Sequence, residues 1–154
     1  MNEILIRPAL AEDLPQLLAF EQAIITAERP FDPCLADDPI SYYDLSALVT
    51  DPLTEVLVAL DGSTLVGSGY VQIRDSKGYF THSRHGYLGF MYTAPDYRGR
   101  GINQMILGTL KEWARERGIS HFKLTVYPDN AAAIKAYKKA GMRANLLEMT
   151  MDVD

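Results

Sequence analysis

The spacing of apolar residues divides the chain into strands and helices. Short apolar runs between turn residues are typical of strands, whereas apolar positions that recur every three or four residues indicate helices. The predicted strands are Ile4–Arg7, Glu55–Leu60, Leu65–Arg74, Tyr87–Thr93, His121–Val126 and Leu147–Asp152. The predicted helices run from Asp13 to just before Pro30, from Ser41 to Val49, from Gly101 to Gly118 and from Ala131 to Ala140.

The order of these elements predicts an α/β fold built on one sheet. Asp61-Gly62 between two apolar runs is a strong hairpin signal, so the flanking strands should be antiparallel. The strand at Tyr87–Thr93 is followed by a helix and then by the strand at His121–Val126. This is the order of a βαβ crossover, and it implies a parallel pair. Asp13 and Gln16 are interpreted as the N-cap of the first helix and its reciprocal partner.

Two glycines, Gly99 and Gly101, stand directly in front of the third helix. Glycine leaves the backbone uncovered, and the first N–H groups of a helix have no partner inside it. An anion can bind at such a turn, where the helix dipole is positive. The residues alone fit two interpretations: a seat for a phosphate or pyrophosphate, and a tight turn from strand to helix without a ligand.

Length and composition indicate one domain, predicted to span residues 1–154. A chain of 154 residues, 47% of them hydrophobic, can bury one sizeable core. The net charge of −5 and the scattered basic residues argue against a nucleic-acid partner. No apolar run has the length of a membrane span, and the first residues lack the pattern of a signal peptide. We therefore expect a cytoplasmic protein with no membrane partner.

Few reactive side chains lie outside these elements. Cys34 is the single cysteine, and a loop or packing thiol explains it better than a nucleophile does. His82 and His85 have the spacing of two ligands on a helix, but no third ligand is near them in sequence. The polar rim of a strand is the better explanation for this pair, so no metal is predicted.

Two motifs in the chain resemble those of the GCN5-related N-acetyltransferase (GNAT) superfamily, and the resemblance covers nearly the whole chain. The pyrophosphate segment of that superfamily reads Gln or Arg, two residues, Gly, one residue, then Gly or Ala. Arg98, Gly101 and Asn103 take these places here. Asn103 departs from the pattern, and its bulk predicts weaker or shifted cofactor binding. The second motif begins at Asn130, contains Tyr137 and ends in Gly-Met where the superfamily has Gly-Phe.

The resemblance implies a fold and an acetyl donor. The GNAT fold is a central, mixed but mostly antiparallel twisted sheet of six to seven strands, flanked by about four helices, with one parallel strand pair that splays apart. In the superfamily, acetyl-CoA lies in that wedge. On the matching positions, the cofactor-binding residues are Met91, Thr93, Arg98, Gly99, Arg100, Gly101, Ile102, Asn103, Gln104 and Asn130. For the two arginines, exposure to solvent without a ligand is the alternative.

Tyr137 takes the superfamily's position for the acid that protonates the leaving thiolate. The ordinary tyrosine pKa of about 10 is close enough to the roughly 8.5 of a thiol for proton transfer or a strong hydrogen bond. The alternative is a core position on an apolar helical stripe. A backbone N–H group around Met91 could stabilise the oxyanion that forms when an amine attacks the thioester.

The general base stays open at the level of sequence. An alkylamine is mostly protonated at neutral pH, so some group must accept a proton before attack. Some GNAT relatives carry a glutamate on the strand before the second motif, and this chain has Thr125 there. Glu148, His82, His85 or an ordered water chain could take its role, and the residues do not choose between them.

The function that the resemblance implies is transfer of an acetyl group from acetyl-CoA to a primary amine, by direct attack in a ternary complex. The irregular segments 29–51 and 75–86 would wall the acceptor pocket. Acidic residues in the first segment, with Tyr42 and Tyr43, favour a small amine or amino-acid derivative. A peptide or protein amine is one alternative, and a non-catalytic acyl-CoA-binding sensor is another. GNAT members commonly dimerise through exposed edge strands, so the resemblance implies a homodimer with the apolar stretch Leu147–Val153 as a contact.

Overall fold

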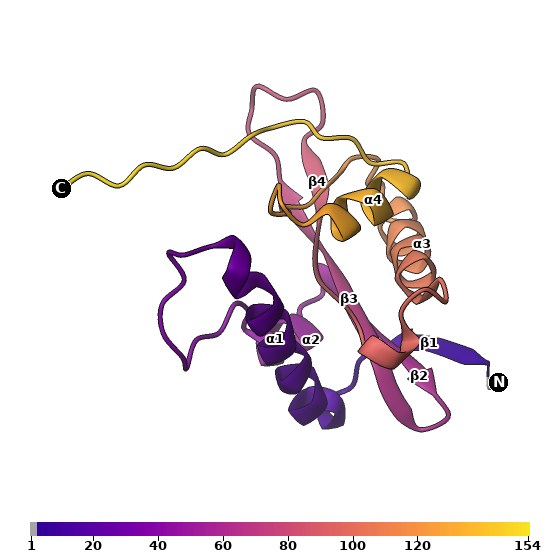
Figure 1. Cartoon of the computed structure of the whole chain (residues 1–154). Helices are drawn as coiled ribbons and strands as arrows, with labels where there is room; N and C mark the ends of the chain where they lie inside the picture. Colours follow the sequence, from indigo (N-terminus) through magenta and orange to yellow (C-terminus); the bar gives the residue numbers. More distant parts are fainter. Residues whose placement is uncertain (1–2) are drawn as a thin grey trace.

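A five-stranded sheet with helices on both faces organises the computed structural model, which describes residues 3–154 (Figure 1). The strands, in spatial order, are β1 (Ile4–Pro8), β2 (Thr54–Asp61), β3 (Thr64–Asp75), β4 (Arg84–Thr93) and β5 (Phe122–Lys123). The main helices are α1 (Leu14–Glu28), α2 (Leu45–Thr50), α3 (Ile102–Arg115) and α4 (Ala131–Lys139). Short 3₁₀ turns lie at Ala11–Asp13, Arg29–Phe31 and Pro95–Tyr97. Residues 1–2 of the predicted domain range lie outside the described part.

The strand pairing follows the two sequence signals. β2 and β3 are antiparallel and meet in a tight turn, where Asp61 pairs with Thr64 and Gly62 has a φ of 60°. β4 and β5 are parallel, with α3 as the crossover between them. The predicted hairpin and the predicted parallel pair are therefore both confirmed.

Each face of the sheet has its own core because the central strands are apolar on both sides. On β2, Val56 and Val58 pack beneath α1 and α2, whereas Leu57 and Ala59 pack beneath α3. The apolar stripe of α3 predicted by helical spacing lies in the second core, where Ile106 is fully buried. No helix in residues 3–154 is both long enough and apolar enough to cross a bilayer.

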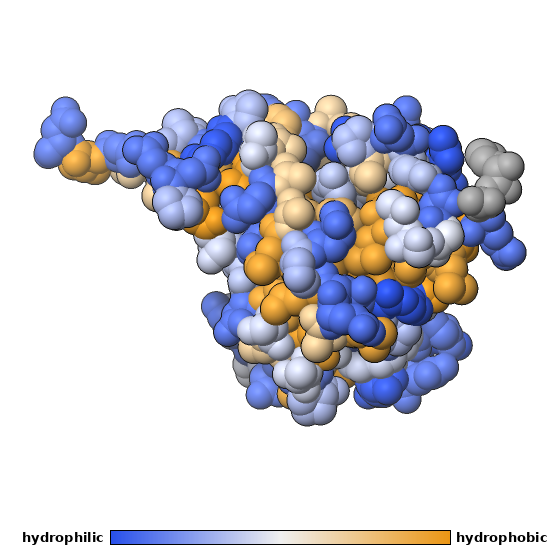
Figure 2. Space-filling view, turned by 90° about the horizontal axis from the view of Figure 1, so that it is seen from below, coloured by the Kyte–Doolittle hydropathy of each residue, from blue (hydrophilic) through white to orange (hydrophobic). Residues whose placement is uncertain are grey.

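The predicted C-terminal strand is wrong. Residues 143–154 form neither strand nor helix, and they extend away from the body in both views (Figures 1 and 2). Leu147, Met149 and Met151 are 69%, 83% and 84% exposed. Alternating apolar residues form a strand only where a partner strand is available, and here the neighbouring edge, β5, is two residues long instead of the predicted six. The described sheet therefore has five strands, not six to seven.

Helix starts correct the sequence prediction in two places. The Asp13 carboxylate does not cap α1; it accepts hydrogen bonds from Arg7 Nη1 at 2.7 Å and from the Leu10 N–H at 2.8 Å. The Arg7 guanidinium holds the pKa of the Asp13 carboxyl below its usual value. The second helix begins at Leu45, later than predicted, because Asp44 caps it by accepting from the Ala47 N–H. Whether an aspartate caps a helix therefore depends on which donor its carboxylate pairs with in the folded chain.

Candidate active site

The parallel strands β4 and β5 part after two residue pairs. Gly86 pairs with Phe122 and Tyr87 with Lys123, and the Gly86 N–H donates to the His121 carbonyl at 2.9 Å. β4 continues to Thr93, whereas the chain after Lys123 leaves the sheet. Among the described residues, the remainder of β4 therefore has no strand beside it on this side. An open edge of this kind can pair with an extended ligand chain.

A bulge in β4 lies along this open edge. Between the pairs Ser68–Tyr92 and Tyr70–Gly89, β4 has one residue more than β3, and the buried Phe90 has a φ of 58°. The Ser68 hydroxyl donates to the Phe90 carbonyl at 2.9 Å, and the Phe90 N–H donates to the Tyr43 hydroxyl at 3.3 Å. A bulky residue keeps a positive φ only where its surroundings hold it, and such backbone clusters at functional sites.

The turn between β4 and α3 exposes backbone N–H groups as the sequence predicts. Gly99 and Gly101 have φ values of 78° and 79°, and a Cβ at either position would meet no atom within 4 Å. No side chain caps α3, and the Met105 N–H donates back to the Gly101 carbonyl at 3.0 Å. The N–H groups of residues 102–104 consequently have no acceptor inside the helix. This turn can bind an anion.

The side chains on the first turn of α3 serve packing. Ile102 is buried in the core, and Gln104 Nε2 donates to the Ala136 carbonyl of α4 at 3.0 Å. Asn103 is half-buried beside them. A hollow of about 160 Å³ next to Gln104 lies between α3 and α4. Ile102 and Gln104 therefore offer a ligand their backbone, while their side chains hold the helix in place.

The two arginines of the turn are exposed, and both contact the protein. Arg98 Nε donates to the Thr93 carbonyl at 3.3 Å, and the Arg100 guanidinium lies 4.9 Å from the centre of the Tyr97 ring. The Tyr97 hydroxyl donates to Asp61 Oδ2 at 2.5 Å. The turn is thereby fastened to the end of β4 and to the β2–β3 hairpin, and both guanidinium groups remain accessible at its rim.

Tyr137 lies on the inward side of α4, half-buried against the core beneath α3. Burial raises the pKa of Tyr137 to about 12, and the negative charge of Glu28 contributes to the shift. The hydroxyl therefore stays protonated over the whole physiological range. At the start of the same helix, Asn130 Oδ1 accepts from the Ala133 N–H at 3.3 Å, so the Asn130 side chain acts as an N-cap in this structure.

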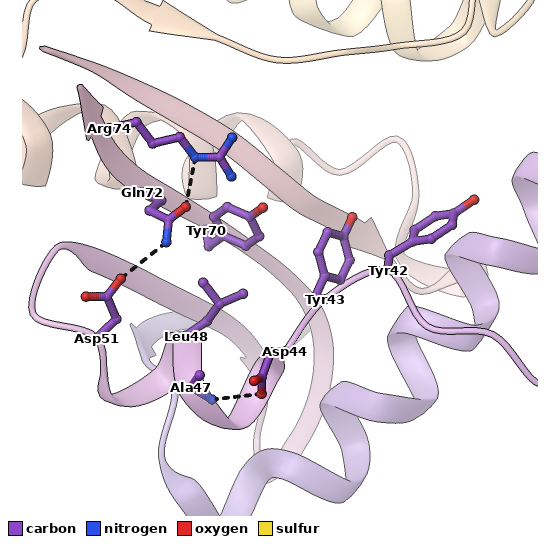
Figure 3. Close-up of a pocket in the computed structure, with 9 residues that line it drawn as sticks. All are labelled: Tyr42, Tyr43, Asp44, Ala47, Leu48, Asp51, Tyr70, Gln72 and Arg74. Atoms are coloured by element: carbon purple, nitrogen blue, oxygen red, sulfur yellow. Dashed lines mark hydrogen bonds between the residues drawn. The ribbon is translucent and has the colours of Figure 1, made fainter. Parts of the chain in front are cut away.

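A pocket of about 360 Å³ opens on the other face of the sheet, between α2 and β3 (Figure 3). The Tyr43 and Tyr70 rings meet edge-on with their centres 5.7 Å apart. Arg74 Nε donates to Gln72 Oε1 at 2.8 Å, and Gln72 Nε2 donates to Asp51 Oδ2 at 3.2 Å. Because the Tyr43 hydroxyl also accepts from the Phe90 N–H, one wall of this pocket reaches the bulge of β4.

The histidines gather into one cluster, which the sequence did not reveal. The Ser76 hydroxyl lies 2.7 Å from His82 Nδ1 and 2.9 Å from His85 Nδ1, and the His82 and His121 rings stack 4.0 Å apart. Burial lowers the pKa values of His85 and His121, with nearby positive charges adding to the shift. No group of three or more His, Cys, Asp or Glu in residues 3–154 could hold a metal ion.

The candidate bases from the sequence are spread over the structure. Glu148 is exposed on the C-terminal segment that extends from the body. His82 and His85 are engaged with Ser76, as described above. The Thr125 hydroxyl lies 3.1 Å from the Tyr87 hydroxyl, just beyond the point where β4 and β5 part.

Tyr127 is a residue of this region that sequence reasoning missed. Its hydroxyl donates to Asp32 Oδ2 at 2.7 Å, and its ring stacks on Phe31 with centres 6.1 Å apart. The contact joins the chain after β5 to the loop after α1, which lies 95 residues earlier in the sequence. No local pattern announces a contact between such distant positions, so only the fold reveals it.

The fold and these motifs together define the class. The chain belongs to the acetyltransferase (GNAT) family, whose model matches residues 19–142. A crystal structure of a predicted acetyltransferase with acetyl-CoA from Clostridium acetobutylicum has the same fold, with a TM-score of 0.77 at 21% identity over 96% of both chains. The resemblance and fold class inferred from the two motifs are confirmed.

The curated relatives that the chain matches include N-acetyltransferases. The chain is 37% identical over 86 residues to thialysine N-epsilon-acetyltransferase of Sus scrofa, covering 53% of this chain and 46% of that protein. It is 23% identical over 109 residues to an aminoglycoside N(6')-acetyltransferase type 1 of Stenotrophomonas maltophilia, covering 69% of both. The chain thus spans about half the length of the thialysine acetyltransferases that it matches.

Proposed function

We propose that this protein transfers an acetyl group from acetyl-CoA to a primary amine. The observation that carries the proposal is the open edge of β4, which runs directly into the exposed N–H groups at the start of α3. An extended arm that ends in a pyrophosphate matches both parts. Membership of the GNAT family supports acetyl-CoA as the donor.

The residues that would hold the donor follow from this arrangement. The backbone of Met91 and Thr93 would pair with the pantetheine arm, and the N–H groups from Gly99 to Gln104 would bind the pyrophosphate. Arg98 and Arg100, exposed at the rim, would add charge-assisted contacts. Asn103 is half-buried on this turn. Its expected effect, weaker or shifted binding of acetyl-CoA, stays a prediction.

Tyr137 would supply a proton to the leaving thiolate. Its pKa of about 12 lies above the roughly 8.5 of a thiol, so the hydroxyl acts first as a hydrogen-bond donor to the developing negative charge. Full transfer becomes favourable as the amine nitrogen gives up its own proton, because that proton can replace the one lost from the Tyr137 oxygen.

For the acceptor, we favour a small amine over a peptide. The pocket of about 360 Å³ has room for a small molecule, and Asp44 and Asp51 are among the residues that line it. The names of the relatives, which act on thialysine and aminoglycosides, agree with a cationic small molecule. A peptide or protein amine stays the alternative, and the homodimer and the cytoplasmic location stay predictions.

Calorimetry with acetyl-CoA, followed by a thiol-release assay with a panel of amines, tests the proposal. Binding together with thiol release for a small amine such as thialysine is the expected result. Binding without release across small amines, aminoglycosides and peptides would instead favour the acyl-CoA-binding sensor. Absence of acetyl-CoA binding would reject the donor site.

A further inference from the structure

Of the residues in 3–154 that line the pocket between α2 and β3, Arg74 is the only basic one (Figure 3). Its Nε donates to Gln72 Oε1 at 2.8 Å, and its guanidinium lies 3.9 Å from the centre of the Tyr87 ring. None of the ion pairs in this part of the chain includes Arg74. In Figure 3 its two terminal nitrogens point away from Gln72, so this end of the guanidinium remains available to an anionic ligand.

The two acidic residues of the pocket lie at the two ends of α2, across from Arg74 in Figure 3. Asp44 caps the start of the helix by accepting from the Ala47 N–H at 3.2 Å. Asp51 follows the end of the helix, and its Oδ2 accepts from the Thr54 hydroxyl at 2.6 Å. The pocket therefore carries negative charge along α2 and positive charge on β3. A ligand that has both an ammonium and a carboxylate group matches this division of charge.

The pocket lies beside the part of β4 that has no neighbouring strand. Tyr87, on which Arg74 stacks, forms the last residue pair between β4 and β5, and its hydroxyl lies 3.1 Å from Thr125 Oγ1 just beyond that pair. Tyr43, on the other side of the pocket, accepts from the Phe90 N–H at 3.3 Å. Side chains around the pocket thus contact β4 at both ends of residues 87–90. A molecule in the pocket would lie next to the open edge where the donor is proposed to bind.

The guanidinium of Arg74 is held in place by the Tyr87 ring and by Gln72 before a ligand arrives. An arginine that is already held loses little side-chain entropy on binding, and its planar fork matches the two oxygens of a carboxylate. The buried Tyr70 lies beside it: burial raises the pKa of Tyr70, and Arg74 acts in the opposite direction. A Cβ on Gly89 would lie 2.6 Å from the Tyr70 hydroxyl, so this wall of the pocket rests directly on β4.

We propose that Arg74 binds a carboxylate of the acceptor, so that the acceptor is an amino acid or a derivative with a free carboxylate; this inference rests on the proposed function. The guanidinium would donate two hydrogen bonds to the carboxylate oxygens, while an amine of the same molecule reaches the open edge of β4. An acceptor that carries only positive charges, such as an aminoglycoside or a diamine, would be repelled by Arg74 and would leave it unpaired. Arg74 is thus a specificity-determining residue.

The test compares two amino acids, thialysine and lysine, each with its own carboxamide, which keeps the shape and removes the negative charge. Wild type should have a kcat/KM about tenfold or more higher for the acid than for the carboxamide, as loss of a charge-assisted pair of hydrogen bonds predicts. In Arg74→Met, which keeps an apolar stem against Tyr87, this ratio should fall to about one. Arg74→Lys should keep part of the preference, because it retains the charge and loses the fork.

Arg117 supplies the matched control, because it is also an exposed arginine that stacks on an aromatic ring. Its guanidinium lies 4.0 Å from the Trp113 ring, at the far end of α3. Arg117→Met should leave the ratio of acid to carboxamide unchanged. A purely structural effect of Arg74→Met would lower kcat/KM for both members of a pair alike, whereas loss of carboxylate binding lowers it for the acid alone. The ratio therefore separates recognition of the carboxylate from a general loss of activity.

Calorimetry in the presence of coenzyme A separates failure of this inference from failure of the proposed function. If wild type releases no thiol with any amine, yet binds the acids more tightly than the carboxamides and loses this preference in Arg74→Met, the enzyme proposal fails and the carboxylate site stands. Thiol release with aminoglycosides but with neither amino acid would overturn the role of Arg74 and leave the enzyme proposal intact. Equal binding of acid and carboxamide by wild type, a preference that Arg74→Met retains, or absence of binding of both amino acids would also overturn it.

Discussion

At the scale of single residues, a substitution of Tyr137 should distinguish a role in proton transfer from a role in binding acetyl-CoA. Tyr137→Phe keeps the ring that packs beneath α3 and removes only the hydroxyl. Because a positioned acid contributes about 10²-fold or more, kcat should fall about 100-fold while the acetyl-CoA Kd stays unchanged. Thiol release and calorimetry measure the two quantities. Tyr79→Phe, at a ring that is 75% exposed, is the control. If Tyr137→Phe had the same kcat as wild type, Tyr137 would serve only to pack the core.

Gly86 is a second position where a single added side chain should change the stability of the protein. A Cβ there would lie 2.8 Å from the Phe122 ring and 2.9 Å from Val71, at one of the two residue pairs that join β4 to β5. Gly86→Ala should therefore lower the free energy of unfolding by about 1–3 kcal/mol, the usual cost of overpacking. Denaturant unfolding checks this value.

The control for Gly86 is a glycine on the surface of α3. A Cβ at Gly108 would meet no atom within 4 Å, so Gly108→Ala should stabilise the protein by up to about 1 kcal/mol through helix propensity. If both substitutions had the same effect on unfolding, the close contact between β4 and β5 would not be what excludes a side chain at Gly86.

At the scale of elements, the two ends of α3 offer a matched comparison. Gly101 at its start and Gly118 beyond its end have φ values of 79° and 84°, so alanine at either should cost about 1–2 kcal/mol of stability. Only Gly101 lies at the proposed pyrophosphate seat, where a Cβ would enter open space that a ligand needs. Gly101→Ala should weaken acetyl-CoA binding at least fivefold by calorimetry, while Gly118→Ala should leave it unchanged. If the two variants bound acetyl-CoA with equal affinity, the pyrophosphate would not bind at this turn.

At the scale of the whole molecule, the C-terminal segment, residues 143–154, exposes apolar side chains that no other part of the same chain buries. Leu147, Met149 and Met151 alternate with polar residues and are all largely exposed. Exposed alternating apolar residues favour pairing with another chain. The prediction is a homodimer that dissociates when Met149 or Met151 is changed to Lys, measured by sedimentation. Leu5→Lys, an exposed residue on β1, is the control. A wild-type monomer would contradict the prediction.

The parts of the fold that depend on residues close together in sequence could be predicted from the sequence. The hairpin at Gly62, the turn at Gly101 and the apolar stripe of α3 were all predicted, and each depends on a few neighbouring residues. The C-terminal strand failed because its alternation is equally compatible with a free segment, and a strand needs a partner that local sequence does not supply. Asp13 failed as a cap because Arg7 on β1 competes for its carboxylate.

By itself, the sequence determined the order of strands and helices from β1 to α4, the glycine turn before α3 and the position of Tyr137 on an inward helical face. These follow from backbone preferences and from spacing along one element, which act over only a few residues. The tertiary structure alone decided that β5 is two residues long and that Tyr127 meets Asp32. Those relations join positions far apart in sequence, so they depend on how the whole chain packs.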